Sequence, residues 1–251
     1  MDISRRTGLR IVTHNLCQGG STDDGNSWQR LLSEIGADII CAQETRHPRN
    51  YLADVYEGLT GAVHEMVPHG KWGSAILSRR HTLTSLPIAD EFKGWVVGAR
   101  VHDFETGEER QDLDVYSVHI PSPGPYERRV GQLIDVLSRI PSDRPRIVAG
   151  DFNITVALRQ EPEEMRNTPG ERRILERLHK ELGLANAWQA VNPSVPLPQT
   201  LRWVREKTTP YHCDGIFVDH RCLPLLREAS VLVDESWARL SDHNPVLAVF
   251  E

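Results

Sequence analysis

The chain has 251 residues, 39% of them hydrophobic, which is enough to bury a large core. We expect one domain over residues 1–251, with two smaller domains as the alternative. The 29 basic and 35 acidic residues leave a formal net charge of -6, which excludes a global basic field that would hold nucleic acid nonspecifically. Any recognition of phosphate must therefore be local.

The cysteines and the apolar stretches narrow the class of protein further. The four cysteines include no CxxC pair, so we expect reduced thiols rather than a zinc cluster or a disulfide framework. The first residues lack the apolar segment of a secretory signal, and no window approaches the roughly 18 consecutive apolar residues of a membrane span. We expect a cytoplasmic protein without membrane insertion, and we expect it to be a monomer.

The N-terminal part has the pattern of a strand, a helix and a second strand. Residues 9–16 form a β-rich run with Asn15 near its end. Residues 27–35 carry apolar side chains at helical spacing between a capping serine and a glycine stop. Residues 37–44 form an apolar run that stops at Gln43-Glu44. This order indicates a βαβ-like unit that places Asn15 and Glu44 at the same ends of neighbouring strands.

The middle of the chain is richer in strands. Apolar and β-branched runs predict strands over residues 62–67, 73–79, 95–103 and 112–119, the last two as a hairpin around the turn 105–108. The last of these strands ends at His119, just before a proline-containing stretch that a central strand would not continue through. Helices are expected within residues 48–60 and over 125–139.

A short apolar run over residues 146–150 is followed by Asp151 and Asn153. A buried strand that ends at Gly150 would place this carboxylate and this carboxamide at its carboxyl end, where open α/β sheets bind ligands. An Asx turn that closes the strand is the structural alternative.

The C-terminal third begins with the clearest helix signal. Thr168-Pro169-Gly170-Glu171 has the pattern of a capping box with proline at the first helical position, and the helix is expected to end at Gly183. Residues 190–199 form an extended loop stiffened by prolines. Strands are expected over residues 201–205, 211–218 and 246–250, the last after Ser241-Asp242-His243-Asn244-Pro245.

Polar side chains with metal-binding or acid–base chemistry follow most of these strands. Oxygen atoms come from Asn15, Glu44, Asp151, Asn153, Asp214 and Asp242, and ring nitrogens come from His119 and His243. An oxygen-rich set suits Mg²⁺, which takes one or two carboxylates together with a substrate phosphate, whereas zinc would want more histidine or cysteine. A carboxylate and two imidazoles are suited to activating water and stabilising a leaving oxygen. The predicted reaction is hydrolysis of a phosphoester.

Each of these residues also has an ordinary structural interpretation. Asn15 and Asp214 could form turns, and Glu44 could be a solvated strand end. Asp242 could belong to a helix cap or a loop, and His119 could be a satisfied core histidine. The recurrence of such residues at several strand ends favours a site over these separate explanations.

Seven short segments carry a family pattern. They are Thr13-His14-Asn15, Ala42-Gln43-Glu44, Ser74-Ala75-Ile76-Leu77-Ser78-Arg79, Ser117-Val118-His119, Gly150-Asp151-Phe152-Asn153, Cys213-Asp214-Gly215-Ile216-Phe217-Val218 and Ser241-Asp242-His243-Asn244-Pro245. In this order they resemble the endonuclease/exonuclease/phosphatase (DNase I-like) superfamily. The resemblance runs from about residue 10 to the C-terminus, and although each segment alone is weak, the ordered set is specific.

The resemblance implies an α/β fold, a four-layer α/β sandwich in which two mixed β-sheets lie face to face with helices outside. It also implies a phosphoesterase site at one edge that depends on Mg²⁺, with Mn²⁺ as the alternative ion. In that family the residue matching Glu44 binds the metal, and those matching Asn15 and Asp242 lie beside it. The resemblance therefore assigns the metal site to Asn15, Glu44 and Asp242.

The resemblance further implies catalytic roles for five residues. Asp151 would orient or deprotonate the attacking water, and Asn153 would hold the phosphate. Asp214 would pair with His243 and set its tautomer, so that His243 contacts the scissile phosphate. His119 would be a second imidazole on the phosphate side, stabilising charge or protonating the leaving group.

Two departures from the family pattern bear on the substrate. Apurinic-site endonucleases of this family usually carry a tyrosine motif where this chain has Ser117-Val118-His119, and an Asn-Gly-Arg-like element where it has Asn15-Leu16-Cys17-Gln18-Gly19-Gly20. The chain looks more like the histidine-bearing branch of nucleases, phosphodiesterases and lipid or inositol phosphatases. Neither departure touches the positions matched to the metal or to the activation of water.

Three segments interleave cations with indoles, namely Lys71-Trp72, Lys93-Gly94-Trp95 and Arg202-Trp203-Val204-Arg205. Such a combination can grip phosphates and stack bases, and our hypothesis is that Trp72 and Arg202 contact the substrate. The alternative is that the tryptophans belong to the core and the cations are solvated strand ends.

The leading interpretation is a Mg²⁺-dependent phosphodiesterase, a nuclease or nucleotide phosphodiesterase whose phosphodiester substrate is nucleic acid or a nucleotide. One alternative is a phosphomonoesterase, or a phosphoesterase acting on a lipid headgroup or an inositol phosphate. A second alternative is a binding scaffold without catalysis. The scaffold would predict missing metal or water-activating residues, and none is missing.

Overall fold

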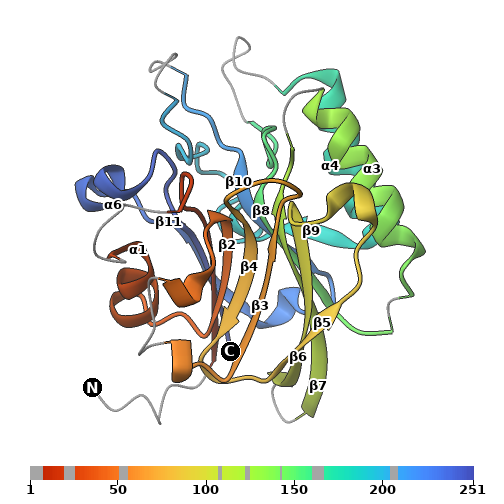
Figure 1. Cartoon of the computed structure of the whole chain (residues 1–251). Helices are drawn as coiled ribbons and strands as arrows, with labels where there is room; N and C mark the ends of the chain where they lie inside the picture. Colours follow the sequence, from red (N-terminus) through yellow and green to blue (C-terminus); the bar gives the residue numbers. More distant parts are fainter. Residues whose placement is uncertain are drawn as a thin grey trace.

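Two mixed six-stranded sheets lie face to face in the computed structural model of the chain (Figure 1). The structure describes residues 8–19, 26–50, 56–106, 109–121, 125–141, 143–159, 167–203 and 209–251. Helices cover the outer face of each sheet, which confirms the four-layer α/β sandwich. Within the described residues, no helix has both the length and the apolar character needed to cross a membrane.

The first sheet has the strand order β11-β12-β1-β2-β4-β3. Its strands are β1 (Leu9–Asn15), β2 (Ile39–Thr45), β3 (Gly61–Met66), β4 (Gly73–Ser78), β11 (Leu226–Val231) and β12 (Val246–Phe250). β1 and β2 are parallel neighbours, with Asn15 opposite Gln43. The expected βαβ-like start is therefore confirmed, and Asn15 and Glu44 lie at the same ends of adjacent strands.

The second sheet has the strand order β5-β6-β7-β8-β10-β9. Its strands are β5 (Leu83–Leu86), β6 (Val96–Thr106), β7 (Glu109–His119), β8 (Arg146–Asp151), β9 (Leu184–Asn186) and β10 (Asp214–Asp219). β6 and β7 pair as the expected hairpin strands. β7 and β8 are parallel, with His119 opposite Asp151, and β10 runs antiparallel to β8, with Asp214 opposite Asp151. This register brings three predicted site residues to one end of the sheet.

Helices pack on both outer faces. On the first sheet lie α1 (Asn26–Gln29), which continues as a π-helical turn over Arg30–Glu34, and α6 (Glu235–Leu240). On the second sheet lie α3 (Tyr126–Arg139) and α4 (Pro169–Leu182), side by side at the right of Figure 1. α5 (Ala187–Val191) packs beside β10 and β11. The capping box of α4 is confirmed, because the Thr168 side chain accepts from the N–H of Glu171 and Gly183 ends the helix in the left-handed conformation.

The alternation of side chains along the strands separates three cores. In β1, Ile11 points into the apolar layer between the sheets, and its neighbour Val12 points under α1 and α6. In β8, Ile147 joins the central layer, and Val148 points under α3 and α4. Strands that are buried on both faces read as continuous apolar runs, which is why these strands were visible in the sequence.

Several elements differ from the expectations. The strand expected over residues 201–205 is wrong for residues 201–203, where Leu201 forms only isolated bridges to Tyr211 and His243. Residues 204 and 205 lie outside the described part of the chain. β10 begins at Asp214 rather than at residue 211. The expected turn at 105–108 and the short helix within 48–60 fall partly outside the described residues. β5, β9, β11, α5 and α6 were not predicted. They are short, and they lack the continuous apolar run that marks β8 and β12, two strands of similar length.

Gly150 allows β7 and β8 to approach each other at the end of the sandwich that carries the polar side chains. Its φ is +152°, and a Cβ at this position would lie 1.9 Å from the backbone oxygen of Val118. Since that oxygen belongs to the strand backbone, it has no room to move aside.

We expect Gly150→Ala to lower the free energy of unfolding by about 3 kcal/mol or more, because it adds both a clash and an unfavourable φ. Urea denaturation of the purified variant measures the loss. Gly131→Ala is the matched control, since Gly131 lies in α3 and its added Cβ would meet nothing closer than a flexible Arg177 nitrogen at 3.3 Å. This control should be neutral or stabilising by up to about 1 kcal/mol. Equal losses at both positions would contradict the close approach.

Candidate active site

The predicted site residues gather at one end of the sandwich, where β1 and β2 of the first sheet meet β7, β8 and β10 of the second. The Asn15 amide links the two sheets, because its Nδ2 donates to Glu44 Oε1 at 3.2 Å and to Asp151 Oδ2 at 3.1 Å. Its Oδ1 accepts from the backbone N–H of Cys17 at 2.9 Å, which fixes the orientation of the amide. The carboxylates of Glu44 and Asp151 are thereby held side by side.

The backbone is strained where two of these side chains leave their strands. Glu44 has φ +49° and Asn153 has φ +53°, values that residues with a Cβ seldom adopt. The turn at Asn153 is held by Asp151, whose Oδ1 accepts from the Asn153 N–H at 2.9 Å. The Asx turn considered as a structural alternative is therefore present, and it fixes the Asp151 carboxylate rather than replacing a site.

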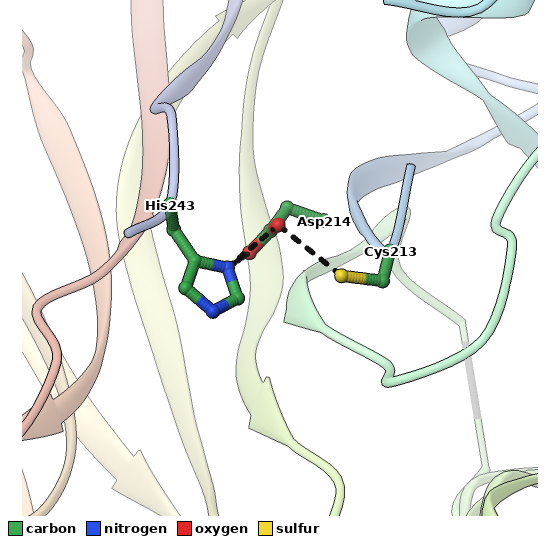
Figure 2. A group of neighbouring side chains, drawn as sticks. All are labelled: Cys213, Asp214 and His243. Atoms are coloured by element: carbon green, nitrogen blue, oxygen red, sulfur yellow. Dashed lines mark hydrogen bonds and ion pairs between the residues drawn. The ribbon is translucent and has the colours of Figure 1, made fainter. Parts of the chain in front are cut away.

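His243 and Asp214 form a buried pair (Figure 2). His243 Nδ1 lies 2.9 Å and 3.0 Å from the two Asp214 oxygens, so the ring donates from Nδ1 and turns Nε2 toward Asp151, 3.9 Å away. Burial alone would lower the pKa of His243, but the charges of Asp214 and Asp151 outweigh it and raise this pKa to about 10. The ring is therefore protonated at neutral pH.

Cys213 lies on the other side of Asp214 in Figure 2. A sulfur, an oxygen and a nitrogen of Cys213, Asp214 and His243 lie within 4.8 Å of one another, and these residue types can hold a metal ion. The thiol would first have to lose its proton, yet burial and the Asp214 charge raise the pKa of Cys213 well above its usual range. The Cys213 Sγ lies 3.6 Å from Asp214 Oδ2. The three residues therefore fit better as a hydrogen-bonded chain in which Cys213 holds Asp214 and Asp214 holds His243.

His119 has different neighbours. Its Nε2 lies 3.6 Å from Glu44 Oε1 and 3.9 Å from Asp151 Oδ2, and its ring packs against Trp72 and Trp95 at centroid distances of 5.4 Å and 5.3 Å. Burial lowers the pKa of His119 to about 4, although Asp151 works against this shift. The two imidazoles of the site therefore differ in charge at neutral pH.

The carboxylates of the site crowd one another. Burial raises the pKa of Glu44, and the charges of Asp151 and Asp242 add to this shift while the Asn15 hydrogen bond opposes it. The pKa of Asp151 is also raised, first by burial and then by Asp214. Carboxylates that raise one another's pKa values in this way are stabilised by a cation placed between them.

The loop that carries Asp242 and His243 is fastened to the rest of the site. Ser241 Oγ donates to the backbone oxygen of Asn15 at 2.7 Å and accepts from the N–H of His243 at 3.0 Å. The guanidinium of Arg202 donates to the Asn244 side chain and to the backbone oxygens of Ser241 and His243. Arg202 thus lies against the loop that presents His243.

These side chains open onto a cavity of about 980 Å³. Of the predicted site residues it is lined by Glu44, Trp72, His119, Asp151, Asn153, Asp242 and His243. Tyr126, Arg159, Glu171, Trp203 and Tyr211 line it too, and none of them was predicted as a site residue. They come from loops and helix ends, so no polar residue after a buried strand marks them in the sequence. Only Trp203, which follows Arg202, belonged to a segment that was considered for substrate contact.

A two-sheet sandwich with carboxylate, carboxamide and imidazole groups at the ends of its central strands defines the DNase I-like class of fold. The sequence profile of the Endonuclease/Exonuclease/phosphatase family matches residues 12–243. The chain therefore belongs to this family.

Solved structures of low sequence identity share the fold. An AP endonuclease from Archaeoglobus fulgidus is 19% identical, with a TM-score of 0.71 over 97% of this chain and 99% of that one. The 3′ phosphatase NExo from Neisseria, bound to a product DNA hairpin, is 20% identical, with a TM-score of 0.71 over 97% and 99%. The AP endonuclease LMAP from Leishmania major is 15% identical, with a TM-score of 0.73 over 100% and 89%.

We expect Asp214→Asn to lower the pKa of His243 from about 10, because the burial that disfavours the charged ring remains while the largest opposing charge and its hydrogen bond are removed. An NMR titration of the histidine ring signals measures this change. Asp219→Asn on the same strand is the control, since Asp219 bonds to Arg221. A His243 pKa that is unchanged in Asp214→Asn would contradict the pairing.

Proposed function

We propose that the protein is a metal-dependent phosphodiesterase that cleaves nucleic acid or a nucleotide at the cavity described above. The observation that carries the proposal is the position of Asp151. Its carboxylate is buried, is held by Asn15 and the Asn153 N–H, and has the Nε2 atoms of two histidines 3.9 Å away. A carboxylate fixed in this way can orient and deprotonate a water beside a bound phosphate.

The donor set fits Mg²⁺, or Mn²⁺ as the alternative ion. Glu44 and Asp242 carry oxygens next to the cavity. Burial raises the pKa of Glu44 and the charges of Asp151 and Asp242 add to this shift, so a divalent cation bound there would stabilise the ionised carboxylates. Asn15 keeps the Glu44 carboxylate in place, and its own oxygen retains a lone pair beyond the bond from Cys17. When bound at Glu44, Asn15 and Asp242, the metal would neutralise charge on the phosphate oxygens.

The remaining groups have roles that follow from their charge and position. Asp151 takes the proton of the attacking water, whose oxygen bonds to phosphorus as the bond to the leaving oxygen breaks. His243, protonated and oriented by Asp214, stabilises negative charge on the phosphoryl oxygens. The Asn153 side chain lies beside Asp151 and lines the cavity, so we assign it to holding the phosphate. His119 Nε2 lies near Glu44 and Asp151, and we assign this ring to the leaving oxygen, where it would stabilise the negative charge or supply a proton.

Arg202 and Trp72 receive different assignments. The bonds of Arg202 to the loop at Ser241 and His243 support a role in positioning His243. Trp72 lines the cavity and packs against His119, which supports contact with the substrate. We further propose that the whole chain acts as one domain, because the site draws on both sheets.

We expect Asp151→Asn to reduce kcat at least about a hundredfold, because the amide cannot accept the proton of water. The substitution keeps the size of the side chain, so the fold and the KM should change little. Steady-state hydrolysis of a phosphodiester, with circular dichroism as the check on folding, measures both. Retention of more than a tenth of the wild-type kcat would exclude Asp151 as the base.

We expect EDTA to abolish hydrolysis, Mg²⁺ to restore it, and Glu44→Gln to weaken Mg²⁺ binding at least about tenfold. Isothermal titration with MgCl₂ measures binding without any substrate. Glu176→Gln is the control, since Glu176 is exposed on α4 and pairs with Lys180. Unchanged Mg²⁺ affinity in Glu44→Gln would show that Glu44 is not a ligand of the metal.

The reaction class is tested with a panel of single- and double-stranded DNA, RNA, abasic DNA, bis-p-nitrophenyl phosphate, p-nitrophenyl phosphate and inositol phosphates. Cleavage of diesters that requires Mg²⁺ and is lost in Asp151→Asn supports the proposal. Release of phosphate from monoesters alone would establish the phosphomonoesterase alternative. No reaction with any substrate, together with unchanged Mg²⁺ affinity in Glu44→Gln, would favour the binding scaffold.

A further inference from the structure

Two pairs of aromatic side chains line the cavity. Trp72 and Trp95 form an edge-to-face pair with centroids 5.1 Å apart, here called the indole pair. Trp203 and Tyr211 form a second edge-to-face pair with centroids 5.9 Å apart, here called the loop pair. Trp203 is 43% exposed, which is unusual for the largest apolar side chain. Both pairs therefore present ring surface to whatever occupies the cavity.

The strand order places the two pairs on opposite flanks of the ionisable groups. Trp72 precedes β4 and Trp95 precedes β6, and these strands lie beside β2 and β7, which carry Glu44 and His119. The loop pair precedes β10, and Leu201 and Arg202 next to it bond to the loop at His243 before β12. β4 packs on β6, so Trp72 and Trp95 lie on the same flank of the sandwich. β12 packs on β10, so the loop pair lies on the opposite flank. The central groups, Asp151 among them, lie between the two pairs.

The charges in the cavity argue against a long nucleic-acid track. Among the described residues that line it, Arg159 is the one arginine or lysine, whereas Glu44, Asp151, Glu171 and Asp242 are acidic. Proteins that follow a nucleic-acid backbone use a groove of positive charge and make many phosphate contacts. Even with the His243 imidazolium counted, the four carboxylates outnumber the cations of the described lining, which leaves the aromatic rings as the main source of affinity outside the central site.

We propose, building on the function proposed above, that the two aromatic pairs stack the nucleobases on either side of the scissile phosphate. The substrate would then be a short single strand whose bases are free to unstack. In a duplex both bases are stacked and paired, so neither pair of rings could reach them without opening the helix. The volume of about 980 Å³ is at the upper end of small-molecule cavities, which suits two nucleosides rather than one.

The test compares probes with the same phosphates and different bases. Asp151→Asn protein in Mg²⁺ is titrated with a fluorescently labelled decathymidylate, with a ten-residue abasic tetrahydrofuran oligomer, and with a blunt duplex, using anisotropy. We expect decathymidylate to bind at least about tenfold more tightly than the abasic oligomer and the duplex. Its affinity should fall less than about fivefold between 50 and 200 mM salt, since few phosphates are contacted.

Variants on each flank test the two pairs separately. Trp203→Ala and Trp72→Ala, each added to Asp151→Asn, should each reduce the preference for bases about tenfold. Trp203→Phe keeps an aromatic ring and should retain most of that preference. This result would show that the loss in Trp203→Ala comes from stacking and not from a change in the loop. Val195→Ala, an exposed apolar position outside the cavity lining, is the control for loss of surface area. If Trp72→Ala does not fold, Trp72→Leu, which keeps apolar bulk but removes the ring, and the exposed Trp203 still test the proposal.

The outcomes separate this inference from the proposed function. Equal affinity for the base-bearing and abasic oligomers would overturn stacking, even if the wild-type protein hydrolyses both. An effect at Trp203 but not at Trp72, or the reverse, would overturn stacking on two sides. Base-dependent binding without hydrolysis of any phosphodiester by the wild-type protein would support the aromatic assignment and overturn the phosphodiesterase.

Discussion

The Asn15 amide is the constraint on which the site depends, because it joins carboxylates from different sheets. Glu44 lies near the end of β2 and Asp151 ends β8, and the Asn15 Nδ2 donates to both, at 3.2 Å and 3.1 Å. Deeper in the sandwich, Gln43 Nε2 makes a second link of this kind to Ser117 Oγ on β7, at 2.9 Å. These buried bonds are made only when each strand keeps its register within its own sheet, since a one-residue slip of β1, β2 or β7 would turn its side chain to the other face. The hydrogen bonds that place the site residues therefore also hold the two sheets together.

The two histidines show how the surroundings, rather than the residue type, decide what a side chain can do. His243 has the Asp214 carboxylate on its Nδ1, whereas the Nδ1 of His119 is buried without a hydrogen-bond partner and its ring lies against two indoles. Burial acts on both rings in the same direction, so the difference in their pKa values comes from the carboxylate. The charged ring of His243 can therefore contact a phosphate, while the neutral ring of His119 adds no second positive charge to the site.

Sequence patterns predicted the parts of the structure that carry a continuous apolar run or a complete capping signal. The buried runs at β1, β2 and β8 and the capping box at Thr168 each carry a signal of their own, and polar residues after the buried strands identified Asn15, Glu44 and Asp151. Short elements without a continuous apolar run, such as β9 and α6, were missed, although the Asp234 cap of α6 was a usable signal. The pairing of Asp214 with His243 came only from the family resemblance. The contacts of Arg202 with the loop at Ser241 depend on tertiary packing, which a local pattern does not contain.

The division between strand ends and loops explains why the chemistry is easier to infer than the substrate. Groups at strand ends are fixed by the sheets, and solved structures at 15 to 20% identity share this two-sheet fold. The cavity walls come from the segments around Trp72, Trp95, Trp203 and Tyr211, which the sheets do not constrain. What these walls carry in this chain is ring surface and negative charge. Under the proposed function, a substrate held there would gain its affinity from stacking and from the metal, because the described lining of the cavity offers Arg159 as its one arginine or lysine to the backbone of a long nucleic acid.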